Sequence, residues 1–185
     1  SVGTVAVRVL GTEETGDRSQ VISTSGTQDP FAALERAETG TGVTVTISAA
    51  SGEPMTPTEI YQKCVPSIVS LWAEGDETSS TGTGIVMSAD GYLLTNAHVV
   101  ANSRTVYAAF YDDTILEAKL VGADADADVA VLKVEASNLT PAEFGDSDQL
   151  LCGDMVVAIG DPLGYRTSIT QGIVSALNRI VNVDG

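Results

Sequence analysis

The sequence contains little positive charge. Its 185 residues include 9 lysines and arginines against 25 acidic residues, which gives a formal net charge of −16. Such a surface repels phosphate backbones and anionic lipid headgroups, so we expect no nucleic-acid partner and no direct membrane contact. Long apolar runs are missing as well, because no stretch approaches the roughly 20 apolar residues of a membrane-spanning helix. The first residues also lack the pattern of an export signal, so we expect a soluble protein or one whose signal has been removed.

Cysteine is scarce. The chain has two, Cys64 and Cys152, which allow at most one disulfide. A small secreted scaffold that depended on disulfides would carry more of them, so we predict two free thiols and keep a Cys64–Cys152 bridge as the alternative. Neither cysteine stands in a motif that favours the reactive thiolate, and neither is predicted to be a nucleophile.

Histidine occurs once, as His98, just after the apolar segment Ile85–Ala97. Imidazole is the side chain best suited to take and return a proton near neutral pH, so the chain has at most one such histidine site. A lone histidine is often only a surface or core residue, and its surroundings decide between the two roles.

Asp128 is the second candidate. It precedes Val129–Val134, a run rich in β-branched residues that is apolar except for Lys133 and is typical of a buried strand. An acid at the entry of such a strand can accept the Nδ1 proton of an imidazole and stabilise the imidazolium that forms when Nε2 takes a proton from a hydroxyl. We therefore predict that His98 and Asp128 are catalytic residues within hydrogen-bonding reach of each other.

Four ordered blocks resemble the HtrA (DegP/DegS-like) branch of the trypsin-like serine endopeptidases. The blocks are Gly82-Thr-Gly84-Ile-Val with Thr95-Asn-Ala-His98-Val-Val, Ala127-Asp128-Val-Ala-Val-Leu, Gly153-Asp-Met-Val-Val-Ala-Ile-Gly160-Asp-Pro-Leu-Gly164, and Gly172-Ile-Val-Ser-Ala-Leu. The resemblance covers about residues 56–185. It implies an all-β fold, a trypsin-like double β-barrel in which the first barrel is complete and the second only begun.

By this resemblance His98 is the general base and Asp128 is the acid that orients it. The nucleophilic serine of the family lies in a Gly-Asn-Ser-Gly-Gly loop that we expect beyond Gly185, so this chain is expected to be an inactive fragment on its own. The resemblance implies a protein quality-control enzyme that degrades unfolded or misfolded polypeptides outside the cytoplasm, secreted or membrane-tethered. It implies a homo-oligomer, a trimer in this family, and no metal or organic cofactor.

A function from another class stays open. The chain could be a non-catalytic pseudoprotease or a β-barrel that binds peptides by strand addition, with His98 and Asp128 as relics. The sequence beyond Gly185 would separate this alternative from the enzyme.

Two other patterns imitate functional motifs. Gly145-Asp-Ser147-Asp148 resembles a protease nucleophile loop, but Asp148 stands where a glycine is needed and its carboxylate would oppose an oxyanion. Asp124, Asp126, Asp128 and Glu135 match the spacing of a calcium loop, but the glycine that its sharp turn requires is replaced by a valine. We predict neither a catalytic Ser147 nor a calcium site.

The composition changes near residue 56. Residues 1–56 are rich in Ser, Thr and Gly, and we predict a mostly extended extension or linker, with a small separate module as the alternative. Residues 57–140 are predicted to form the first barrel. Residues 141–185 are predicted to form the interbarrel connection and the first strands of the second barrel.

Local patterns predict the elements within these parts. In the extension, an aspartate cap before a proline predicts a short helix over Asp29–Glu38, and Val2–Leu10 or Gly42–Ser48 could pair as edge strands. A second helix is predicted to follow Thr56 and to end before Pro66. Strands are predicted over residues 67–73, 83–87, 92–95, 105–110, 115–122, 128–134, 155–160 and 167–177, with turns at 89–91 and 112–113.

Overall fold

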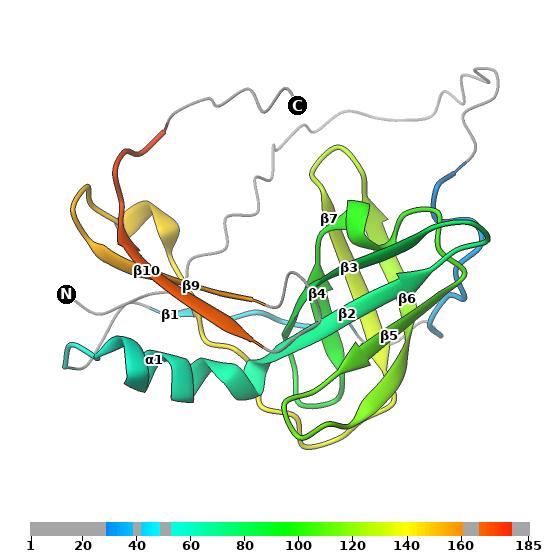
Figure 1. The fold of residues 1–185 in the computed structure, drawn as a ribbon, viewed down its shortest axis with the longest axis horizontal. Helices are drawn as coiled ribbons and strands as arrows, with labels where there is room; N and C mark the ends of the chain where they lie inside the picture. The colour runs from blue at the N-terminus through cyan, green and yellow to red at the C-terminus, as the bar shows by residue number, and fades with distance from the viewer. Residues whose placement is uncertain (1–28, 39–41, 49–52, 161–166, 179–185) are drawn as a thin grey trace.

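Six antiparallel strands form a closed barrel in the computed structural model of the protein, which describes residues 29–38, 42–48, 53–160 and 167–178 (Figure 1). Their order around the barrel is β2-β3-β4-β7-β6-β5, and β5 pairs with β2 to close it. The strands are β2 (Ile68–Glu74), β3 (Ser79–Val86), β4 (Tyr92–Thr95), β5 (Thr105–Ala109), β6 (Ile115–Asp124) and β7 (Val129–Val134). The predicted all-β barrel and its six strands are confirmed, with differences of a few residues at the strand ends.

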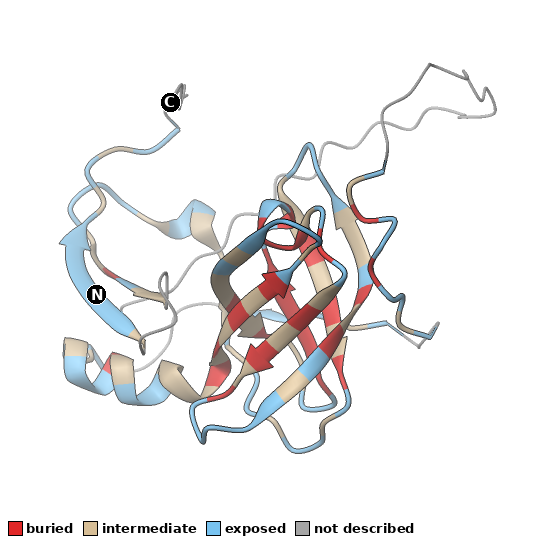
Figure 2. Cartoon of the chain, turned by 45° about the vertical axis from the view of Figure 1, so that its right-hand side comes forward, coloured by how far each residue is buried: buried red, intermediate tan, exposed pale blue. Residues whose placement is uncertain are grey.

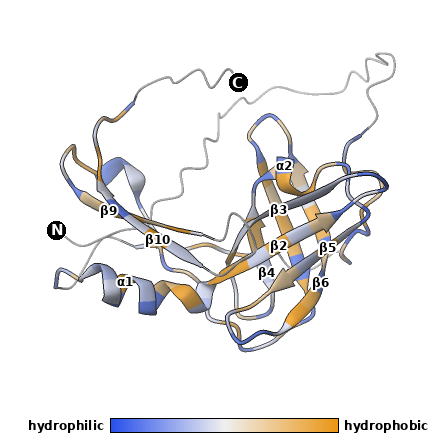
Figure 3. Cartoon of the chain, in the orientation of Figure 1, coloured by the Kyte–Doolittle hydropathy of each residue, from blue (hydrophilic) through white to orange (hydrophobic). Residues whose placement is uncertain are grey.

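Alternation of buried and less buried residues along β2, β5 and β7 builds much of the core, and β4 is buried throughout. In β2 the buried residues are Val69, Leu71 and Ala73, and in β7 every second residue from Ala130 is buried. Successive side chains of a strand point to opposite faces, so this period of two places one face of each alternating strand inside the barrel. Figure 2 shows buried residues along the strands of the barrel, and Figure 3 shows apolar residues along the same strands. Each fully buried Leu or Val contributes about 1.5–3 kcal/mol.

The turn before β4 depends on a glycine. Gly91 has a φ of 106°, and an added Cβ would lie 2.2 Å from the carbonyl oxygen of Val134. Only glycine combines this backbone conformation with so close an approach to β7. The turns predicted at 89–91 and 112–113 are both present, and Asp113 also has a positive φ, of 66°.

The predicted second helix is α1 (Pro57–Cys64). Thr56 and Glu59 form a capping box, in which the Glu59 amide donates to Oγ1 of Thr56 and the Thr56 amide donates to Oε2 of Glu59. A 3-10 turn, η1 (Val65–Ser67), then leads into β2. The Tyr61 hydroxyl donates to the carbonyl of Thr167, which ties α1 to the start of a later strand.

The helix predicted for Asp29–Glu38 is wrong. Two turns occur there. The backbone amide of Ala32 donates a hydrogen bond to the carbonyl of Asp29, and that of Leu34 donates to the carbonyl of Phe31, so each bond spans three residues instead of the four of an α-helix. The side chain of Asp29 accepts from the amide of Phe31 and stabilises the first turn instead of a helix.

An open edge of β6 explains this difference. Strand β5 pairs with β6 only as far as Glu117, so the same side of β6 is unpaired beyond that point. Residues 35–37 fill it, because the Leu120 amide donates to Glu35 and the Ala37 amide donates to Leu120, both at 2.9 Å. Pairing an exposed strand edge satisfies backbone groups that a helix would leave unsatisfied on β6.

Residues 29–38 also contribute to the core. Phe31 is 7% exposed and Leu34 is 5% exposed, and both belong to the hydrophobic core of the barrel. The Lys119 ammonium forms an ion pair with Glu35 at 2.6 Å. These residues are part of the folded barrel, whereas the role of residues 1–56 as a whole remains a prediction, and Val2–Leu10 lies outside the described residues.

Two short pieces connect the barrel with the later part of the chain. Strand β1 (Ile47–Ser48), within the segment predicted as an edge strand, pairs in parallel with β8 (Phe144–Gly145). The 3-10 turn η2 (Ser147–Gln149) comes next. The segment before α1 therefore pairs with the segment that follows the barrel.

A separate antiparallel hairpin lies beside the barrel and α1 (Figure 1). It consists of β9 (Met155–Gly160) and β10 (Ser168–Ile173), which agree with the predicted first strands of a second barrel. Every residue of β10 is exposed, including Ile169 and Ile173. Over the described ranges, no helix has both the length and the apolar character needed to cross a bilayer.

The core position of Phe31 and Leu34 leads to a stability prediction. We expect Phe31→Ala and Leu34→Ala each to lower the free energy of unfolding by about 2–5 kcal/mol, because each leaves a cavity in the barrel core. Val45→Ala, at an exposed position of the same extension, should change it by only about 0.5 kcal/mol. Urea unfolding of the 185-residue chain measures the unfolding free energy of all three variants. If Phe31→Ala and Leu34→Ala lower it as little as Val45→Ala does, residues 29–38 do not contribute to the core.

Candidate functional site

Strand pairing brings the two predicted site residues to one rim of the barrel. Strands β4 and β7 are antiparallel neighbours, and Thr95 of β4 lies opposite Ala130 of β7. His98 lies three residues after Thr95, in the short helix α2 (Ala97–Val100), and Asp128 lies two residues before Ala130. The end of one strand and the start of its neighbour must meet at the same edge.

The predicted contact between His98 and Asp128 is confirmed. The Nδ1 atom of His98 lies 2.9 Å from Oδ1 and 2.8 Å from Oδ2 of Asp128. The backbone amide of His98 donates to Oδ1 of the same carboxylate at 2.9 Å. The carboxylate therefore binds both the main chain and the ring of His98, which fixes the ring orientation relative to α2.

This contact selects one tautomer of the ring. An ionised carboxylate can only accept hydrogen bonds, so Nδ1 of His98 must carry the proton that faces Asp128. In the neutral ring, Nε2 then has a free lone pair. The His98 side chain is 70% exposed, which leaves room for a reactant beside it. The exposed Nε2 can therefore accept a proton from a hydroxyl placed beside the ring.

The surroundings of Asp128 keep it ionised. Partial burial is the largest single influence and raises its pKa, but the opposing influences together are larger. Hydrogen bonds from the amide and ring of His98, Coulombic attraction to His98 and a hydrogen bond from Asn96 hold the pKa of Asp128 below its ordinary value. The Asp128 side chain is 43% exposed, so solvent screens part of this effect.

The turn before β7 presents the carboxylate. The Oδ1 atom of Asp124 accepts from the amides of Asp126 and Ala127, each at 2.9 Å, and this closes the turn after β6. Asp128 follows with a φ of 52°, in the left-handed region that aspartate tolerates better than most residues. Asp124 is thus used inside the turn, and the described residues contain no group of three or more possible metal ligands.

Close packing of α2 on β3 sets the position of His98. A Cβ added at Gly82 would lie 2.7 and 2.8 Å from the two Cγ atoms of Val99, the residue after His98. The hydroxyl of the buried Thr95 donates to the carbonyl of Thr83 at 2.9 Å and joins β4 to the same strand. The glycine of the Gly82-Thr-Gly84 block therefore lets α2 approach β3 closely.

Asn96 belongs to the site, although the sequence did not mark it. Its amide nitrogen donates to the carbonyl oxygen of Asp128 at 3.2 Å and to Oδ2 of Asp128 at 3.1 Å. Asn96 is two residues from His98 in the Thr-Asn-Ala-His block, which was the only available signal. Asparagine before a short helix is ordinarily explained as a helix cap, and so the pattern alone did not indicate a contact with Asp128.

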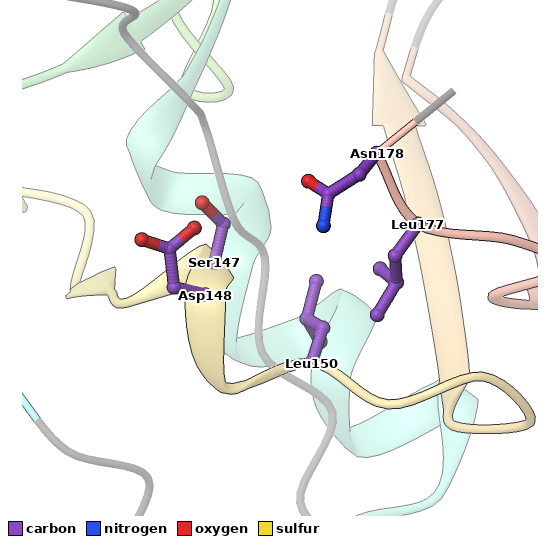
Figure 4. A pocket seen from close by; sticks show the side chains of 5 residues that line it. All are labelled: Ser147, Asp148, Leu150, Leu177 and Asn178. Atoms are coloured by element: carbon purple, nitrogen blue, oxygen red, sulfur yellow. The ribbon is translucent and has the colours of Figure 1, made fainter.

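Ser147 lies in a different place. It belongs to η2 and borders a surface pocket that is also lined by Asp148, Leu150, Leu177 and Asn178 (Figure 4). Neither His98 nor Asp128 lines this pocket. Asp148 follows Ser147 directly, and its amide donates to the side chain of Asp146. The pocket therefore offers Ser147 no histidine to act as its base.

The two cysteines are free thiols. Cys64 is partly buried at the end of α1, and burial raises the pKa of its thiol. Cys152 is exposed in the loop before β9. A raised pKa disfavours the thiolate, so Cys64 is not set up as a nucleophile.

Residues 82–185 match the trypsin-like peptidase domain family. A curated relative from Halomonas elongata, described as a "probable periplasmic serine endoprotease DegP-like", is 48% identical over 109 residues, which are 59% of this chain and 23% of the relative. A protein of Ectopseudomonas mendocina with the same description is 44% identical over 122 residues, 65% of this chain and 26% of the relative. The chain thus spans about a quarter of the length of the curated relatives that it matches.

Solved structures resemble the chain as well. The HtrA-type protease AlgW, solved with a tripeptide, matches with a TM-score of 0.65 and 38% sequence identity, over 68% of this chain and 42% of that chain. The similarity therefore includes the amino-acid sequence as well as the fold.

The contact between Gly82 and Val99 leads to a prediction about α2. We expect Gly82→Ala to cost about 1–3 kcal/mol of unfolding free energy and to shift the NMR signals of His98, because the β-branched Val99 cannot rotate away and α2 must move. Gly122→Ala is the matched control, since nothing lies within 4 Å of a Cβ at that position. If the His98 signals respond alike in both variants, α2 does not depend on the approach at Gly82.

The lowered pKa of Asp128 leads to a prediction about pH. A carboxyl whose pKa is lower in the folded chain stabilises the fold above its unfolded-state pKa, about 3.9, and loses this contribution as the pH falls through the folded-state pKa. Wild type should therefore exceed Asp128→Asn in unfolding free energy at about pH 6, and the difference should vanish near pH 2. Urea unfolding across this range tests it, with the exposed Asp126→Asn as control, and a pH-independent difference contradicts it.

Proposed function

The chain belongs to the trypsin-like peptidase family, with HtrA-type proteases among its relatives, and we propose that it is the first part of the catalytic domain of a serine endopeptidase. In this proposal His98 is the general base and Asp128 is the acid that orients it. The observation that carries the proposal is the contact of Nδ1 of His98 with both carboxylate oxygens of Asp128 on an exposed rim.

The proposed reaction is acyl transfer. Nε2 of His98 takes the proton of a serine hydroxyl while the serine oxygen attacks the carbonyl carbon of the scissile peptide bond. The imidazolium, stabilised by Asp128, then gives that proton to the leaving amine, and the acyl group stays on the serine until water releases it. The proton-accepting steps need the neutral tautomer with its proton on Nδ1, which the contact with Asp128 selects.

The nucleophilic serine and the oxyanion hole belong to the rest of the domain in this proposal. Ser147 is not assigned as the nucleophile, because it borders a pocket that neither His98 nor Asp128 lines. A Gly-Asn-Ser-Gly-Gly loop encoded beyond Gly185 in the gene would complete the catalytic group. Its replacement there by a loop without serine would favour a pseudoprotease or a peptide-binding barrel.

The resemblance also supports a substrate class and a location. We propose that the whole enzyme cleaves unfolded or misfolded polypeptides outside the cytoplasm, as the periplasmic description of two relatives and the tripeptide bound to AlgW suggest. Assembly into a homo-trimer is part of the same proposal, and the mass of the whole protein in solution tests it.

Three aspartates in one turn provide the test. In the full-length protein we expect Asp128→Asn to lower kcat by on the order of 10⁴, because an amide of the same size holds His98 in the wrong tautomer. Asp124→Asn and Asp126→Asn should change kcat by less than about 3-fold, because an asparagine oxygen at position 124 can still accept the two amides of the turn, and the exposed Asp126 enters the turn only through its backbone amide. Hydrolysis of casein by the purified variants measures all three effects.

The same series separates the protease from a calcium protein. A calcium loop would use all three carboxylates, so the three variants would lose activity alike and added calcium would restore it. That result would remove Asp128 from the proposed catalytic role. A wild-type protein with the complete serine loop and no hydrolysis would favour the non-catalytic alternative.

A further inference from the structure

We infer that Asn96 is a positioning residue, whose amide holds the main chain and the carboxylate of Asp128 in the geometry that orients His98. The inference rests on the proposed function for its effect on catalysis, but the contact between Asn96 and Asp128 can be tested without activity. It adds a third residue to the pair that the sequence indicated.

The direction of the Asn96 amide follows from chemistry. Its nitrogen lies 3.2 Å from the carbonyl oxygen of Asp128 and 3.1 Å from Oδ2 of the same residue. Both partners can only accept hydrogen bonds, so the NH₂ group must face them and the flipped amide would place oxygen against oxygen. Its two N–H groups can therefore serve both acceptors.

Asn96 stands where a helix cap would be, yet it does not act as one. It is the residue before α2, with an extended backbone (φ −80°, ψ 143°), and its side chain makes no capping hydrogen bond. Asparagine is among the best capping residues, because its oxygen accepts from the first amides of a helix. Here the side chain is turned toward Asp128, so capping does not account for it.

Asp128 needs such a partner. Its φ of 52° lies in the left-handed region, which few residues other than glycine, asparagine and aspartate adopt, and contacts to both its carbonyl and its carboxylate hold the residue there. The amide and ring of His98 hold Oδ1, and the ring also contacts Oδ2, but both come from one residue. Asn96 is the contact that joins the carboxylate and the carbonyl of Asp128 to the end of β4.

Two substitutions separate positioning from capping. Serine and aspartate cap helices about as well as asparagine, so Asn96→Ser and Asn96→Asp would leave α2 and His98 unchanged if Asn96 were only a cap. Serine is too short to reach both acceptors of Asp128. The aspartate variant has nearly the same shape but places a carboxylate against the carboxylate of Asp128, and this repulsion makes it the more damaging of the two.

NMR of the 185-residue chain reads the geometry directly, because His98 is the only histidine. We expect the Nδ1 proton of His98 to exchange with water about 10-fold faster in Asn96→Ser than in wild type, and faster still in Asn96→Asp. The Asn96→Asp effect should diminish as the pH falls and the two carboxyls share a proton. Asn102→Gly is the control. It also removes an asparagine side chain, but beyond the other end of α2, and glycine tolerates the φ of 59° at that position.

Steady-state kinetics of the full-length protein measure the effect of the Asn96 variants on catalysis. Asn96→Ser should lower kcat by about 10-fold with KM unchanged, and Asn96→Asp should lower it more, with a smaller deficit toward acid pH. Wild-type exchange and kcat in both Asn96 variants overturn the inference. Changed exchange in a protein whose wild type hydrolyses no peptide supports the positioning role and rejects the proposed function, so the two can fail separately.

Discussion

The antiparallel pairing of β4 with β7 is the constraint on which the site depends. These strands are separated by two others in the chain, and they become neighbours only because the barrel closes through β6, β5 and β2. Their register brings the residues after Thr95 to the residues before Ala130. A shift of one residue would turn every inward side chain of β7 outward and would carry Asp128 away from His98, so the buried core holds the site in register.

The rim of the barrel combines a rigid, buried support with exposed polar groups. Leu132 and Val134 of β7 are fully buried, whereas the ring of His98 is mostly exposed. The strands therefore provide the packing energy, and the segments just beyond their ends carry the exposed polar groups. Small residues and turns link the two parts: Gly82 lets α2 approach β3, and the turn closed by Asp124 presents Asp128. Polar contacts then orient the carboxylate, which a hydrophobic core cannot do because its interactions have no direction.

The fold could be predicted from the sequence where the signal was local. Short strand-like runs separated by turns predicted the barrel strands, and the capping residue Thr56 with Pro66 predicted α1 and its end. Residues 29–38 were predicted wrongly, because a proline after an aspartate resembles a helix start, while the true partner of this segment is the open edge of β6, more than eighty residues later in the chain. An unpaired strand edge exists only after the sheet has formed.

The sequence by itself determined which residues can do the chemistry. A single histidine, an acid at the entry of a β-branched run and the small-residue blocks around them indicated His98 and Asp128, since residue type and period are properties of the chain alone. Only the tertiary structure decided that Asn96 turns from its own helix to Asp128, that Gly82 meets Val99, and that Ser147 borders a pocket without His98. These contacts join segments that are apart in the sequence and meet only in the folded chain, and no local pattern encodes the distance between them.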